Sequence, residues 1–107
     1  MAQYLYQAAY TAESLAAQMR KPKDRLRIVA GQLKSAGVQI LAGGYSLGES
    51  DIAIIMEAKD DATIAAAAIA IGAGGAVRNA RTTKLLSGAE YVKALRKAAT
   101  IAYKPAK

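Results

Sequence analysis

The segment DIAIIMEA, residues 51–58, most restricts what this chain can fold into. It is short and rich in isoleucine, and it follows the turn-forming residues Gly48–Ser50, so it predicts a β-strand. Successive side chains of a strand point to opposite faces of the sheet. One face would carry Ile52, Ile54 and Met56, and the other Ala53, Ile55 and Glu57. A strand that is apolar on both faces needs cover on both, so helices on one side of the sheet are not enough.

The rest of the chain predicts three further strands and several helices around this one. Strands are predicted over 3–10, 38–47 and 76–86, with the Gly43–Gly44 pair weakening the second of them or forming a bulge. Helices are predicted over 12–19 after a Thr11 cap, from Pro22 to Gly37, from Asp60 or Asp61 to Gly72, and from Ser87 onward, where Ser87 and Glu90 have capping-box spacing. The apolar stripes of the last three helices are Leu26, Val29, Ala30 and Leu33; Ile64, Ala68 and Ile71; and Tyr91, Ala94, Leu95, Ala98 and Ala102.

This order of elements predicts an α+β, ferredoxin-like βαββαβ fold. The antiparallel sheet would have strand order 4-1-3-2, with two helices on one face and a C-terminal helix that reaches only part of the other. Because the second face would otherwise be exposed, we expect a homodimer or higher homo-oligomer that packs sheet to sheet as a dimeric α/β barrel. Residues 1–86 would form the domain, and residues 87–107 a basic C-terminal helix and tail.

The absence of two residue types excludes much chemistry. The chain has no cysteine and no histidine, so it lacks thiolate nucleophiles, disulfides, imidazole metal ligands and the serine–histidine–aspartate triad. We therefore expect no metal and no cofactor. Any acid–base chemistry would fall to Asp, Glu, Tyr or Lys.

The net charge of +7 raises nucleic acid as a partner, but its distribution argues against one. Five basic residues lie in the last fifteen positions, and residues 1–92 carry ten basic and eight acidic groups. These five are Lys93, Arg96, Lys97, Lys104 and Lys107. A basic helix and tail is more often a solvated face, so nucleic-acid binding is kept as an alternative. The N-terminal sequence lacks a signal peptide and no apolar run is long enough for a membrane span, so we expect a cytoplasmic protein without a membrane partner.

The candidate binding residues are an aspartate, two arginines and several tyrosines. Asp51 would either serve as a general base or ligand acceptor, or accept backbone N–H groups in its turn; the second role is favoured. Arg78 and Arg81 would lie on opposite faces of their strand, where one could hold a carboxylate ligand or form a salt bridge. Tyr4, Tyr6 and Tyr45 would form either an aromatic wall for a flat ligand or part of the core or interface.

Several short motifs together resemble the GYD domain family. They are Tyr10–Thr11, Gly48–Ile52, Glu57–Asp61, and Gly72 with Gly75–Thr83, and the likeness covers residues 3–86. The family name refers to a Gly-x-Tyr-Asp-type motif: Gly48 and Asp51 match it, and Ser50 stands where a tyrosine is usual. The resemblance implies a dimeric α/β barrel and no particular reaction, and any ligand role of that tyrosine would be lost or altered here.

Three functions follow as expectations. The first is a homo-oligomeric domain that is structural or binds a small molecule, with Tyr6, Tyr45, Asp51, Arg78 and Arg81 as candidate ligand contacts. The second is a cofactor-independent enzyme, of oxygenase or isomerase type, that uses Asp, Tyr and Arg side chains inside the barrel. The third is a nucleic-acid-associated protein that uses the basic tail.

Overall fold

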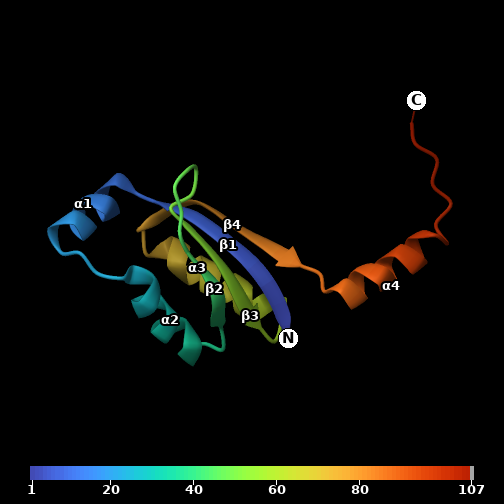
Figure 1. The fold of residues 1–107 in the computed structure, drawn as a ribbon, viewed down its shortest axis with the longest axis horizontal. Coiled ribbons are helices and arrows are strands. Elements are labelled where there is room, and N and C mark those ends of the chain that lie inside the picture. Colours follow the sequence, from blue (N-terminus) through green and yellow to red (C-terminus); the bar gives the residue numbers. More distant parts are fainter. Residues whose placement is uncertain (107) are drawn as a thin grey trace.

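A computed structural model describes residues 1–106 and shows one sheet with four helices (Figure 1). Lys107 of the predicted basic tail lies outside the described residues. The elements are β1 (Ala2–Tyr10), α1 (Ala12–Arg20), α2 (Arg25–Ser35), β2 (Gln39–Tyr45), β3 (Ile52–Ala58), α3 (Asp61–Ala73), β4 (Val77–Leu85) and α4 (Gly88–Ala98). The predicted elements are all present in the predicted order.

The four strands form an antiparallel sheet with the order β2-β3-β1-β4, which confirms the predicted α+β, ferredoxin-like topology. β1 and β3 lie at its centre. Tyr6 pairs with Ile54 and Tyr4 with Met56, and these side chains are almost fully buried beneath the helices. The core is therefore the layer between one sheet face and α2 and α3, to which Leu33 and Ile64 contribute.

The helices begin where their caps place them. Thr11, Asp60 and Ser87 each accept a backbone N–H of the following turn, as predicted, and the Ser87–Glu90 capping box is complete. The prediction that α2 begins at Pro22 is wrong. Asp24 is its N-cap and accepts the backbone N–H of Arg27, so the first helical residue is Arg25.

Two irregularities bend the sheet. The register of β2 against β3 shifts between Ile40 and Ala42, so the bulge lies just before the Gly43–Gly44 pair at which it was predicted. The second shift lies between β1 and β4, opposite Gln7 and Ala9. Bulges of this kind re-aim side chains near a strand end.

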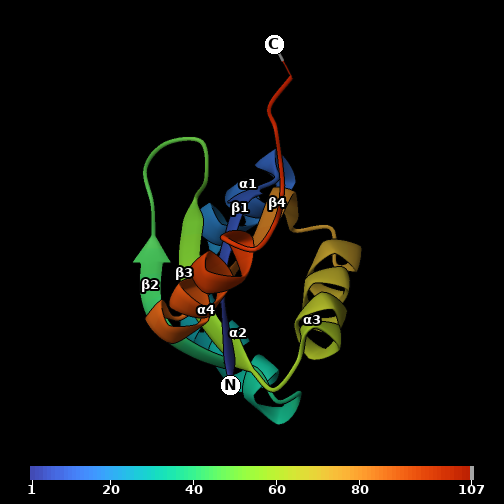
Figure 2. The ribbon, with the colours of Figure 1, turned by 90° about the vertical axis from the view of Figure 1, so that its right-hand side faces the viewer.

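The other face of the sheet is not covered by any helix of the described chain. β3 places Ala53, Ile55 and Glu57 there, half-buried; the alternation predicted that these three share a face, and the structure shows that it is the uncovered one. α4 projects away from the body instead (Figures 1 and 2), and each of its residues is exposed. The radius of gyration, 17.2 Å, exceeds the value of about 13 Å for a compact domain of this size.

Candidate functional site

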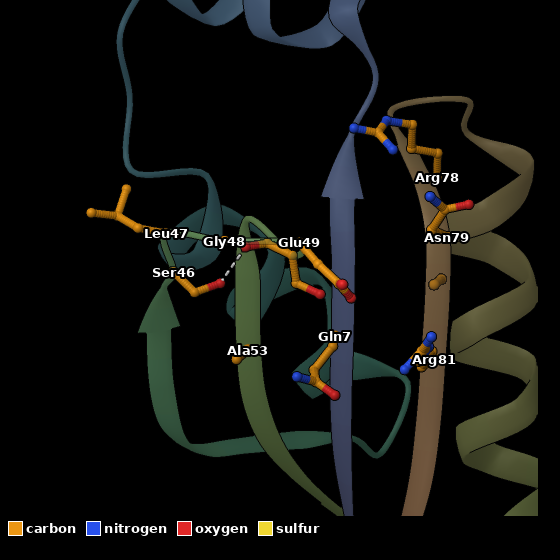
Figure 3. Close-up of a pocket in the computed structure, with 11 residues that line it drawn as sticks. Gln7, Ser46, Leu47, Gly48, Glu49, Ala53, Arg78, Asn79 and Arg81 are labelled. Carbon is orange, nitrogen blue, oxygen red and sulfur yellow. Dashed lines mark hydrogen bonds between the residues drawn. The ribbon is translucent and has the colours of Figure 1, made fainter.

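A polar hollow lies on the uncovered sheet face, where the β2–β3 loop meets the beginning of β4 (Figure 3). Its volume is about 740 Å³. Gln7 of β1 and Ala53 of β3 form its floor, the loop residues 46–50 form one wall, and residues 78–81 form the other. We call this hollow the open-face pocket.

Both arginines of β4 lie on the side of the open-face pocket. Gln7 pairs with Arg81 and Ala9 with Arg78, and paired residues of antiparallel strands share a face. The prediction that the two arginines lie on opposite faces is therefore wrong. The reason is the bulge: Asn79 has a φ of 51°, and residues 79 and 80 together lie opposite the single residue Ala8.

The positive charges of the pocket have no partner within the described chain. The one ion pair among the described residues joins Lys84 and Asp61, on the helix side of the sheet. The guanidinium groups of Arg78 and Arg81 are therefore not neutralised by a carboxylate. Glu49 lines the facing wall, and its side chain projects over the sheet toward Gln7 (Figure 3). The open-face pocket therefore presents two free guanidinium forks and one carboxylate to whatever approaches the sheet.

Asp51 has a structural place. Its Oδ2 accepts the backbone N–H of Tyr10 at 2.8 Å, its own N–H donates to the carbonyl of Ala8 at 2.9 Å, and its carbonyl accepts the N–H of Ser46 at 2.8 Å. These bonds join the end of β1 to both ends of the β2–β3 loop. The predicted turn role of Asp51 is thus the one that its contacts support.

The other two motif residues shape the loop wall of the pocket. Gly48 has a φ of 143°, a conformation that residues with a Cβ rarely adopt. The carbonyl of Ser50 accepts the hydroxyl of Ser46 at 2.7 Å, which closes the loop at its base. Both residues line the open-face pocket.

The candidate tyrosines lie on the helix side of the sheet, away from the arginines. Tyr6 is almost fully buried; its hydroxyl has no hydrogen-bond partner in the described chain, and burial raises its pKa. The Tyr45 hydroxyl donates to Asp24 Oδ1 at 2.6 Å and accepts the backbone N–H of Leu26 at 2.9 Å. Burial, and then the bond to Asp24, raise the Tyr45 pKa.

Tyr4, the third tyrosine of the predicted aromatic wall, is also buried in the core. Its hydroxyl donates to Asp61 Oδ1 at 2.5 Å, and this bond, with burial, raises the pKa of Tyr4 to about 12. The same bond lowers the pKa of Asp61. The structure therefore does not gather the predicted tyrosines and arginines into one site.

A second hollow, of about 820 Å³, lies between α2 and α3 on the helix side, and its wall along α3 is formed mainly by alanines. Within residues 1–106, no group of three or more acidic side chains is placed to hold a metal. No described helix is long and apolar enough to cross a bilayer.

Gln7, Glu49 and Asn79 are pocket residues that the sequence analysis missed. Gln7 could have been found, because a polar residue at a central-strand position with Leu5 and Ala9 on the same face is unusual. The role of Asn79 had a weaker signal: asparagine is among the few residues that tolerate a positive φ.

The sequence carries a recognisable family pattern over this whole architecture. A model of the GYD domain matches residues 4–95, further along the chain than the resemblance over residues 3–86 and into α4. No curated protein and no solved structure gives a significant match. Because the matched residues make up most of the chain, the protein belongs to the GYD domain family.

Proposed function

We propose that the protein is a homodimer that pairs through its uncovered sheet face and binds a small anionic molecule in the open-face pocket. The observation that carries the proposal is the placement of Arg78 and Arg81 on one face with no carboxylate partner in the described chain. A guanidinium fork matches the two oxygens of a carboxylate, so each of the two arginines along this wall of the pocket suits a carboxylate group of a ligand.

The sheet face supports the dimer half of the proposal. Leu5, Ile55 and Leu85 lie on it beside polar residues such as Gln3 and Glu57. A mixed face of this kind is typical of an interface with an apolar centre and a polar rim. A second sheet packed over this face would also cover the pocket. By excluding water it would strengthen the electrostatic attraction between the arginines and a bound anion.

Ligand binding can be tested by thermal unfolding with a series of mono- and dicarboxylates, with inorganic phosphate as a further probe. A ligand at about a hundred times its Kd stabilises the folded protein by about 2.7 kcal/mol, which raises Tm by several degrees. We expect at least one carboxylate to raise Tm, and Arg81→Gln to remove most of that rise.

The matched control is Lys59→Gln, which removes the same charge far from the open-face pocket and should keep the rise in Tm. An equal rise in wild type and Arg81→Gln would contradict the site. The absence of any rise across the series would contradict carboxylate binding as the function.

The two alternative functions, an enzyme and a nucleic-acid-associated protein, would each use different residues of the chain. An enzyme of the predicted cofactor-independent kind would use Asp, Tyr and Arg together, whereas Asp51 bonds to backbone and the tyrosines lie across the sheet from the arginines. A nucleic-acid role would depend on the basic tail, so DNA binding should then disappear when residues 93–107 are deleted. Like the sequence expectation, the proposal takes the protein to be cytoplasmic.

A further inference from the structure

Two apolar helical surfaces of this chain lack a partner. The first is α4, whose exposed residues include Tyr91, Val92 and Leu95, 57%, 43% and 51% accessible. These side chains share one side of the helix, and Lys93 and Arg96 lie outside it. An amphipathic helix with its apolar stripe in solvent has not reached the surface that it fits.

α4 is also too short to be stable on its own. It has eleven residues, and isolated helices shorter than about 12–15 residues are marginal in water because packing supplies most of their stability. The capping box at Ser87 and Glu90 fixes where the helix begins, with bonds of 3.1 and 3.0 Å, but it supplies no packing. The missing packing has to come from outside the body of this chain.

The second surface is the outer side of α3. Residues 62–77 contain no charged side chain, and a helix that is apolar all round is normally buried. Only one side of α3 packs on the sheet, through Ile64 and Ala67. Ala62, Ala66 and Ile69 are exposed on a neighbouring side of the helix, where the two alanines also line the hollow between α2 and α3 and Ile69 is 71% accessible.

The two surfaces complement each other. The small side chains on the outer side of α3 allow a second helix to approach closely, and the larger side chains of the α4 stripe would fill the space between them. In that packing the apolar stripe of α4 would cover the outer side of α3. The basic side of α4 would then face water in place of the apolar surface of α3. The helices are also of similar length, thirteen and eleven residues.

We propose that α4 is an exchanged arm, which packs its Tyr91–Leu95 stripe on the outer side of α3 of a second copy. In this structure α4 projects from the end of β4 away from its own α3 (Figures 1 and 2), which leaves it free to reach another copy. The contact uses residues distinct from the open-face pocket and does not depend on anion binding there.

The natural absence of cysteine allows a clean test. Two tagged chains, one with Leu95→Cys and one with Ala66→Cys, are co-expressed at full length and treated with a mild oxidant or a short bis-maleimide. A cross-link between the two tags can form only between copies. We expect about tenfold more of it than with Lys93→Cys in place of Leu95→Cys, because a disulfide needs Cα atoms within about 7 Å.

A cross-link no stronger than that of the Lys93→Cys control would overturn the proposal. A cross-link from Leu95→Cys to Ile55→Cys that exceeds the one to Ala66→Cys would overturn it too, because α4 would then lie on the sheet face. A second readout needs no cross-linking: Leu95→Glu should increase binding of a hydrophobic dye by exposing α3, and Lys93→Glu should not. An equal dye response from these two variants would also count against the exchange.

Discussion

The adjacent residues Gly43 and Gly44 of β2 should respond in opposite ways to the same substitution. At Gly43, φ is +114°, and a Cβ added there would lie 2.2 Å from the carbonyl oxygen of Ala53 and 2.6 Å from the Cα of Ile54. These are backbone atoms of the central strand β3, which cannot move without disturbing its pairing with β1 as well. Gly44 has an ordinary φ, and a Cβ there would meet no atom within 4 Å.

The expected cost of Gly43→Ala has two parts. A residue with a Cβ in a positive-φ conformation costs about 1–2 kcal/mol, and an overpacked contact that the backbone cannot relieve costs about 1–3 kcal/mol. We therefore expect a loss of about 3 kcal/mol in the free energy of unfolding, a large part of the roughly 5–15 kcal/mol of a typical domain. Gly44→Ala should change it by less than about 0.5 kcal/mol.

Urea unfolding followed by circular dichroism measures both variants, with the shift in midpoint at constant slope giving the change in stability. The reasoning fails if the two substitutions cost the same, or if Gly43→Ala is neutral. Either result would mean that β2 does not approach β3 as closely at this point as the structure shows.

Two further predictions concern the contacts of Asp51 and Tyr4. Asp51→Ala should lower the free energy of unfolding by about 1–3 kcal/mol, because the backbone N–H of Tyr10 loses its acceptor. Any rise in Tm that a carboxylate ligand causes should be kept in this variant. Loss of that rise with unchanged stability would show that Asp51 binds the ligand instead. The raised pKa of Tyr4, about 12, means that the stability it contributes is complete below pH 10 and is lost as the pH rises through 12. Unfolding free energies measured from pH 8 to 12 should fall less steeply in Tyr4→Phe than in wild type. Parallel curves would refute a raised Tyr4 pKa as a source of the pH dependence.

Local rules were sufficient for the framework of this fold. The alternation of residues 51–58 correctly divided the side chains of β3 between the two sheet faces, and spacing alone predicted the Ser87–Glu90 capping box. These features depend on residues close together in sequence. The order of the strands followed in the same way from the order of the elements.

The candidate site was less predictable, because it depends on register between distant strands. One extra residue in β4 moves Arg78 onto the face of Arg81, and only the pairing with β1 reveals it. The same holds for Tyr45, which pairs with Ile52 and so faces the helices, where Asp24 binds its hydroxyl. A strand pattern with a period of two cannot anticipate a bulge.

The central claim is that the uncovered sheet face pairs with a second copy, and the mass of the protein in solution tests it most directly. Sedimentation velocity or light scattering at micromolar concentration should give at least twice the chain mass of 11.1 kDa for wild type. In a Leu95→Glu background, which removes the contact between copies through α4, Ile55→Glu places a charge at the centre of the sheet face and should lower the mass, whereas Met19→Glu on the exposed side of α1 should not. A wild-type protein that stays monomeric, or an Ile55→Glu variant with an unchanged mass, would contradict the account.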